Sequence, residues 1–127
     1  KQIVDAIKNG AQSFNKPDNK PGLLLVSGLE YTITDKGDVV DVQFVSRDGT
    51  KTKIDVNNPS TDKKYTVACD DFFACGGDNY LPVNPNPDYV EKKFDVDKNV
   101  YTANYMKNQK GPIEIKADDR IKIIKSA

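Results

Sequence analysis

The residues best suited to chemistry lie in one run, Ala68–Tyr80, which combines two cysteines, two adjacent carboxylates, two phenylalanines and a glycine turn that ends on a tyrosine. Gly76 and Gly77 have no Cβ, so they can adopt positive φ and let the backbone pass close to a ligand. Asp78 and Asn79 tolerate tight turns, which would present the tyrosine at the exit of the loop. The run predicts a ligand-binding loop; the alternative is an ordinary glycine turn beside a core tyrosine.

The adjacent carboxylates and the two thiols are candidate metal or acid–base groups. Asp70 and Asp71 follow a β-prone segment, and neighbours on a strand point to opposite faces, so we do not expect them to share a proton or a metal ion. Cys69 and Cys75 could form a disulfide, bind a metal or be two unrelated small residues. Two thiols are fewer than the four ligands of a structural zinc site, and the chain has no histidine. We favour two small residues and no metal site, while a short-loop disulfide stays open for a secreted protein.

Composition limits the kinds of partner. The 127 residues suffice for one domain and are too few for two. The 19 basic and 19 acidic residues give a formal net charge of zero, which disfavours nucleic acid polymers and anionic membranes as partners. The longest apolar run, Leu23–Val26, is too short to cross a bilayer, and no signal-peptide pattern opens the chain. Without histidine, the chain also lacks a histidine general base and a Ser-His-Asp triad.

Hydrophobic periodicity predicts the helices that flank the loop. An amphipathic helix opens the chain and ends near Gly10, because apolar residues recur at i, i+3 and i+4. These residues are Ile3, Ala6 and Ile7. A second helix is expected after Asp95 or Asp97, either of which can cap it, and it ends at Gln109–Pro112. Its shared apolar face is Val96, Val100 and Ala103.

The strand pattern predicts an α+β fold with a mixed, largely antiparallel sheet and two or three helices. A buried strand is expected at 23–26 and an antiparallel meander through 29–33, 40–44 and 50–54. Further strands are expected at 65–69, 89–94, 113–115 and 121–124. We expect the proline-rich segment 81–88 to form a rim of the binding cleft, and we assign Phe72 and Phe73 to the core.

Two ordered motifs carry a resemblance to a known family. Residues 65–80, YTVACDDFFACGGDNY, resemble the "YTVAtnDFLAsGGDGY/F" signature in the C-terminal domain of 5′-nucleotidases, a family that includes UDP-sugar hydrolases and 2′,3′-cyclic nucleotide phosphodiesterases. Residues 21–32, PGLLLVSGLEYT, resemble the family's "G-x-F-L-Q-V-S-G-L-x-Y-T" strand pair. The opening helix and residues 120–124 are similar to the matching elements of that domain, so the resemblance covers nearly the whole chain.

The resemblance implies that residues 1–127 are one partial C-terminal domain. In the family an "N-G-G-x-I-R" loop precedes the part seen here, so we expect the chain to be an N-terminally truncated piece. A separate N-terminal domain would hold two divalent metal ions and hydrolyse the phosphate ester, which leaves this chain without cofactor or catalysis of its own. The implied partners are a nucleotide or nucleoside and the parent's own catalytic domain. The implied location is extracellular, cell-surface or periplasmic.

The resemblance also assigns residues to the binding of the substrate. An aromatic pair would stack the base: Tyr80 matches one platform, whereas Leu23 stands where the family has phenylalanine, which weakens stacking. Asp71 matches a family aspartate expected to support the loop, and Asp78 is expected to organise it. The implied substrate-binding residues are Tyr80, Leu23, Gly76, Gly77, Asp78 and Asn79. The alternative is a non-enzymatic surface binding or adhesion module derived from this domain, for which Leu23 would mark lost stacking.

Overall fold

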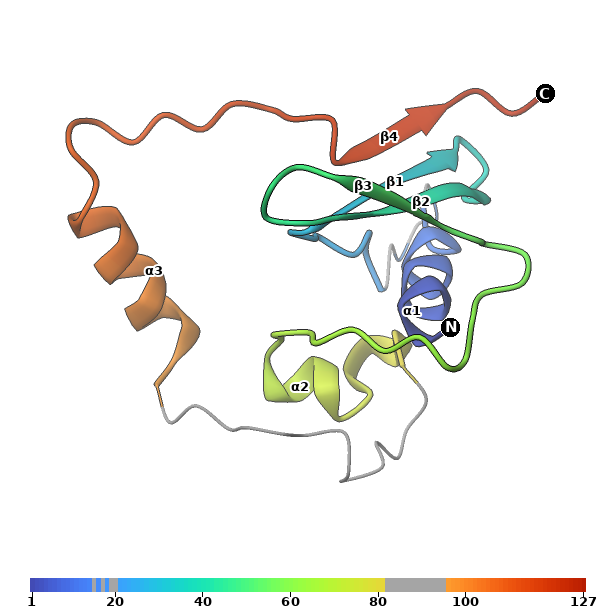
Figure 1. Cartoon of the computed structure of the whole chain (residues 1–127), viewed down its shortest axis with the longest axis horizontal. Helices are drawn as coiled ribbons and strands as arrows, with labels where there is room; N and C mark the ends of the chain where they lie inside the picture. The colour runs from blue at the N-terminus through green and yellow to red at the C-terminus, as the bar shows by residue number, and fades with distance from the viewer. Residues whose placement is uncertain (15, 17, 19–20, 82–95) are drawn as a thin grey trace.

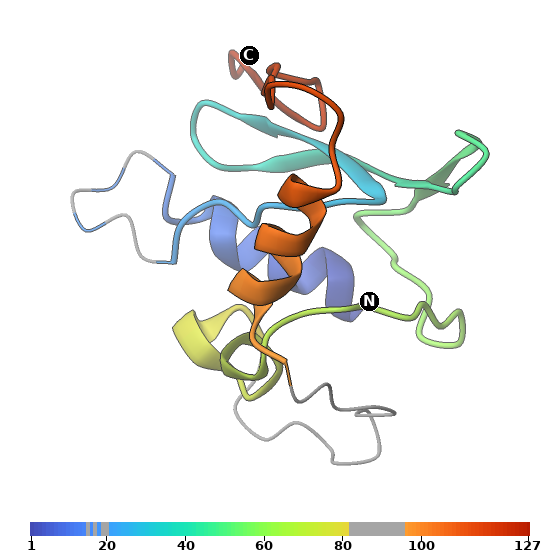
Figure 2. The same cartoon turned by 90° about the vertical axis from the view of Figure 1, so that its left-hand side faces the viewer.

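The computed structural model describes residues 1–14, 16, 18, 21–81 and 96–127. It has an α+β fold with a four-stranded mixed sheet, as the sequence predicts. The sheet lies above α1 and α2 in both ribbon views, and α3 stands apart from it (Figures 1 and 2). In chain order the elements are α1 (Gln2–Ala11), β1 (Leu29–Thr34), β2 (Val39–Val45), β3 (Lys51–Ile54), α2 (Asp71–Ala74), the 3-10 helix η1 (Gly77–Asn79), α3 (Lys98–Lys107) and β4 (Ile121–Ile124).

The strands of the sheet are ordered β3-β2-β1-β4. The predicted meander is confirmed, since β1, β2 and β3 pair antiparallel with Tyr31 opposite Val42 and Val42 opposite Ile54. The predicted last strand is also confirmed as β4, which lies parallel to β1 with Ile121 beside Tyr31. The parallel pair makes the sheet mixed and leaves β3 and β4 as its edges.

The core lies between α1 and one face of the sheet. The predicted opening helix is confirmed, and its apolar face packs against β1 and β2. The buried cluster is Val4, Ile7, Ala11, Tyr31, Ile33, Val42 and Val56. Gly10 does not end the helix, which continues to Ala11. A Cβ on Gly10 would lie 2.8 Å from the carbonyl oxygen of Gly22 and 3.0 Å from Cε1 of Tyr80, so glycine here permits close packing.

The predicted buried strand at 23–26 is wrong. Leu23 and Val26 pack partly against the core, but Leu25 is 85% exposed and the segment joins no strand of the described sheet. Side chains satisfy its backbone instead. The carbonyls of residues 22, 24 and 26 accept hydrogen bonds from Tyr80, Tyr31 and Arg120 at 2.7, 2.8 and 3.0 Å. These three carbonyls therefore have hydrogen-bond donors although the segment joins no strand of the described sheet.

The predicted strands at 65–69 and 113–115 are also wrong. Residues 65–69 form no strand: the preceding loop is tied to α1, and Tyr65 meets the sheet through its ring, which lies 5.1 Å from that of Phe44 in β2. The Lys1 amino group donates to the Ser60 carbonyl at 2.8 Å, and Lys8 Nζ donates to the Val56 carbonyl at 2.7 Å. Residues 113–115 form no strand and are exposed, with Ile113 at 43% and Ile115 at 93%. Strand propensity alone does not form a strand without a partner edge.

The helix predicted after Asp97 is confirmed as α3, with Asp97 at its N-cap position. Its expected apolar face is exposed, since no described residue of α3 is buried. An ion pair of 2.8 Å between Lys98 and Asp70 links the start of α3 to α2. The predicted strand at 89–94 and nearly all of the predicted rim at 81–88 lie outside the described residues. No helix in the described part of the chain is long and apolar enough to cross a membrane.

Candidate functional site

The glycine loop begins with a capped helical turn rather than the end of a strand. Asp70 is the N-cap of α2, and its Oδ1 accepts a hydrogen bond of 2.8 Å from the Phe73 backbone N–H. Asp71 is the first helical residue, and its Oδ1 accepts from the next backbone N–H, that of Phe72, at 2.9 Å. The strand placement of this carboxylate pair is therefore wrong. Both carboxylates stabilise the start of α2, which is a local form of loop support.

The turn itself uses the left-handed conformations that its sequence predicts. Gly76 has φ of 84°, and Asp78 and Asn79 have φ of 53° and 58°. Gly77 differs, because its φ is not positive. A Cβ on Gly77 would lie 2.5 Å from the ring of Phe72, so the glycine makes room for this ring. The turn therefore places the backbone of Gly77 directly against the ring of Phe72.

Tyr80 is half-buried and joins three segments. Its hydroxyl donates a 2.7 Å hydrogen bond to the Gly22 carbonyl, and its own carbonyl accepts one of 2.9 Å from Asn9 Nδ2. Its ring lies 5.5 Å from the ring of Phe73, tilted by 38°. Burial raises the pKa of the Tyr80 hydroxyl, with a smaller contribution from the charge of Asp78. The hydroxyl is therefore a neutral donor at neutral pH.

The structure brings most of the predicted site residues together. The bond from Tyr80 to Gly22 sets the glycine loop beside the residue that precedes Leu23. Leu23 is half-buried and packs against the core cluster, which limits the face it can offer to a ligand. Asp78 accepts no hydrogen bond within the described residues, so no hydrogen bond there supports its predicted role in organising the loop. The loop geometry depends on Asp70 instead.

Phe72 is the residue that the sequence interpretation misplaced. It was assigned to the core, and its side chain is 60% exposed, so that assignment is wrong. Phe73 is half-buried against Tyr80. Successive residues of a helix point about 100° apart, and in α2 this turns the Phe73 ring toward Tyr80 and leaves the Phe72 ring open to solvent. The Asp70 cap was the signal that could have placed Phe72 outward.

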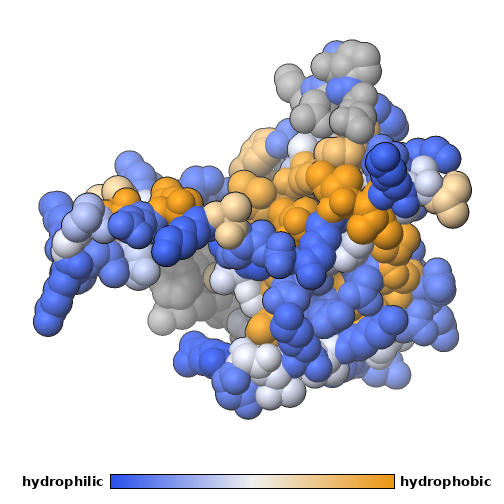
Figure 3. Space-filling view, turned by 90° about the horizontal axis from the view of Figure 1, so that it is seen from above, coloured by the Kyte–Doolittle hydropathy of each residue, from blue (hydrophilic) through white to orange (hydrophobic). Residues whose placement is uncertain are grey.

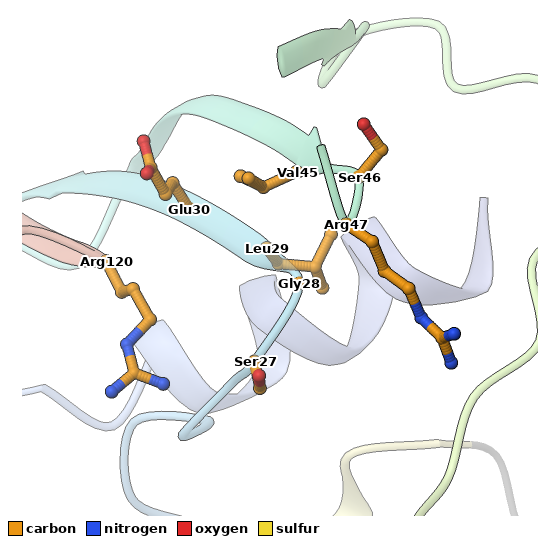
Figure 4. A pocket seen from close by; sticks show the side chains of 8 residues that line it. All are labelled: Ser27, Gly28, Leu29, Glu30, Val45, Ser46, Arg47 and Arg120. Carbon is orange, nitrogen blue, oxygen red and sulfur yellow. The ribbon is translucent and has the colours of Figure 1, made fainter. Parts of the chain in front are cut away.

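A separate shallow hollow of about 370 Å³ lies at the open end of the β1–β2 hairpin, where Leu29 begins β1 and Val45 ends β2 (Figure 4). Arg47 and Arg120 extend from its opposite sides, with Ser27 and Gly28 between them (Figure 4). Arg120 is held by Asp118 and by the Val26 carbonyl. No residue of this hollow belongs to the predicted site, and the glycine loop does not line it.

The thiols and carboxylates form no metal centre in the described chain. Cys69 and Cys75 are both free and exposed, so they are not joined in a disulfide. Partial burial raises the pKa of the Cys69 thiol, and the neighbouring charge of Asp70 adds to this. Among the described residues, no group of three or more His, Cys, Asp or Glu could hold a metal ion.

Comparison with known proteins adds no assignment. No protein-family model matches the chain, and no curated protein or solved structure matches it. The candidate site residues bring together one exposed phenylalanine, two half-buried aromatic rings and a tight glycine turn.

Proposed function

We propose that this chain is the nucleotide-binding part of an exported 5′-nucleotidase-type phosphohydrolase. It holds the base of the substrate while a separate dimetal domain hydrolyses the phosphate ester. One observation carries the proposal: the hydrogen bond from the Tyr80 hydroxyl to the Gly22 carbonyl joins segments 65–80 and 21–32. These are the two segments whose sequences resemble the family, and 58 positions separate the bonded residues.

The aromatic groups of the loop support base binding on physical grounds. Every nucleobase has a π face, and stacking on an aromatic side chain is worth about 1–3 kcal/mol per base. Phe72 supplies exposed ring area beside Gly77, and Tyr80 supplies a ring fixed at its hydroxyl and at its backbone carbonyl. A ring held in place loses little conformational entropy when it binds a ligand. Leu23 adds apolar contact without a π face.

The division of labour follows from the residue types. The chain has no histidine, and the Asp70 carboxylate beside the loop is engaged in the cap of α2 and in the ion pair with Lys98. Binding and positioning a substrate do not require a histidine. In the proposed enzyme, this chain contributes affinity and orientation, while proton transfer and metal-assisted attack on phosphorus belong to the other domain.

The test is a titration of adenosine, with uridine as comparator, into the isotopically labelled chain, followed by backbone NMR. We expect saturable shifts confined to residues 72–81 and 22–24. Phe72→Leu and Tyr80→Ala should each weaken binding by about tenfold, which corresponds to the loss of one stacking contact. Tyr105→Leu is the control: it removes a tyrosine on α3 that is 66% exposed, close to the 60% of Phe72, and should leave the affinity unchanged.

Two results would contradict the proposal. If millimolar nucleoside gives no saturable shift at residues 72–81, the chain does not hold the base. If shifts occur but survive Phe72→Leu and Tyr80→Ala together, the aromatic loop is not the site. Either outcome would favour a binding or adhesion module that has lost the nucleotide site.

A further inference from the structure

The two edges of the sheet differ in how they are protected. The β3 edge carries Lys51 and Lys53, and these lysines pair with Glu30 at 2.7 Å and Asp41 at 3.5 Å. Charged side chains of this kind discourage the addition of another strand. The β4 edge carries isoleucines at 121, 123 and 124 instead, and no strand of the described chain lies beyond it. β4 carries a single lysine, Lys122, against the two of β3, so the β4 edge is the less protected of the two.

The backbone of β4 presents unused hydrogen-bonding groups at this edge. The Arg120 carbonyl accepts from the Tyr31 N–H, and the Ile124 carbonyl accepts from the Asp35 N–H, both at 2.8 Å. In a parallel ladder, alternate residues bond to the same neighbour. The N–H and C=O groups of residues 121 and 123 therefore point away from β1. They form the donor and acceptor row that an incoming strand would use.

The apolar face of the sheet that packs on α1 is incompletely covered at β4. Ile33 is completely buried, but its neighbour on the same face, Ile123, is 50% exposed. Leu25 and Ile121 line an adjoining shallow hollow. Figure 3, which looks down on the side where β4 is uppermost in Figure 1, shows apolar side chains gathered in a continuous patch. An added strand would extend the core layer over Ile123.

Charge indicates what kind of strand fits. Lys122 and Lys125 make no ion pair within the described residues, and the stretch 121–125 contains no acidic residue. Two copies of β4 paired antiparallel about Ile123 would bring the two Lys122 side chains to diagonal positions on one face, where like charges repel. A strand with acidic residues on the face of Lys122 would pair with this lysine instead.

We propose that the β4 edge is a strand-addition site for an extended peptide segment that alternates β-branched apolar residues with acidic ones. The segment extends the sheet beyond β4, bonds to the backbone of residues 121 and 123, covers Ile123 and pairs with Lys122. Its main-chain bonds supply affinity, and the apolar and acidic positions supply selectivity.

The test uses a synthetic probe, acetyl-Val-Glu-Ile-Glu-Val-amide, titrated into the labelled chain and followed by backbone NMR. Saturable shifts should centre on residues 120–125. Ile123→Pro removes an N–H that points away from β1, so β4 should stay paired while probe binding falls at least about tenfold. Ile115→Pro is the matched control, because residue 115 lies outside the strand and is fully exposed. Unchanged amide shifts in β1 would show that both variants keep the fold.

Three results would overturn the proposal. The first is no saturable shift at residues 120–125. The second is equal binding of a probe in which lysines replace the glutamates, because the charge argument requires a loss of at least about tenfold. The third is reversible dimerisation in sedimentation velocity that Ile123→Pro abolishes and that excess probe does not reverse, which would assign the edge to a second copy of the chain.

Discussion

The hydroxyl of Tyr80 donates a 2.7 Å hydrogen bond to the backbone carbonyl of Gly22. This bond fastens the end of the glycine loop to a segment that has no strand partner among the described residues. It also fixes the Tyr80 ring against Gly10 of α1, where there is no Cβ to hold it away. The tyrosine therefore has two separable parts: the hydroxyl joins two segments, and the ring provides aromatic surface.

Substituting Tyr80 in two ways should separate these parts. Tyr80→Phe removes the donor but keeps the ring, so we expect a loss of about 1 kcal/mol in the free energy of unfolding. Tyr80→Ala also removes half-buried ring packing, and we expect a loss of about 2–4 kcal/mol. Urea denaturation measures both. Nucleoside affinity should change less than about threefold in Tyr80→Phe, because stacking needs the ring alone. Equal loss of affinity in the two variants would contradict the stacking role.

Gly10 tests how closely the loop and α1 must approach. In a helix, Ala is favoured over Gly by about 1 kcal/mol. The added Cβ would nevertheless meet the Gly22 carbonyl at 2.8 Å, and overpacking against a fixed group costs about 1–3 kcal/mol. We therefore expect Gly10→Ala to lower the free energy of unfolding by about 1 kcal/mol, measured by urea denaturation. Gln2→Ala, on the exposed start of α1, should change it by less than about 0.5 kcal/mol. A stabilised Gly10→Ala variant would show that the two segments can move apart.

Tyr31 should give the protein a distinctive loss of stability in alkali. Burial raises the pKa of its hydroxyl from 10.0 to about 12, with a smaller contribution from Tyr80. Its neutral form is favoured in the folded state, so its contribution is fully present below pH 10 and is lost as the pH rises toward 12. We expect a decline of about 2–3 kcal/mol across that window in urea denaturation. Tyr31→Phe should flatten the decline, whereas Tyr105→Phe should not. An unchanged slope in Tyr31→Phe would assign the decline to other groups.

Local sequence patterns predicted the meander and the opening helix because their partners are close along the chain. Alternation in residues 29–54 places each strand next to the following one through a short turn, and the structure confirms it. β4 was also predicted correctly as a strand. Its parallel pairing with β1 could not be read from its four residues, because a parallel partner lies far away in sequence.

The failure at residues 23–26 comes from contacts between distant parts of the chain. Segment 23–26 has the composition of a buried strand, but the carbonyls of Gly22, Leu24 and Val26 accept from side chains 58, 7 and 94 positions away. No local pattern reports such contacts. The left-handed turn at Gly76 was predictable, since only a few residue types tolerate positive φ. The exposure of Phe72 depended on recognising Asp70 as a helix cap instead of the end of a strand.

Asp70 has two roles that substitutions can separate. Its Oδ1 caps α2, and its Oδ2 pairs with Lys98 at the start of α3. The pairing with Lys98, followed by the bond from the Phe73 N–H, holds the pKa of Asp70 below its usual value. The stabilising effect of the carboxylate is therefore present above its ordinary pKa of 3.8 and is lost as the pH falls through the lower folded-state value.

Asp70→Asn should keep the cap and lose the ion pair, since Asn is an equally good N-cap residue. Amide hydrogen exchange should show unchanged protection at Phe73 and faster exchange in the first turn of α3. Asp70→Ala should lose both and cost about 1 kcal/mol of local stability in α2, seen as faster exchange at Phe73. Lys98→Gln should reproduce the effect of Asp70→Asn on α3 and leave Phe73 unaffected. Faster exchange at Phe73 in Lys98→Gln would mean that the ion pair positions the cap, so the two roles would be one.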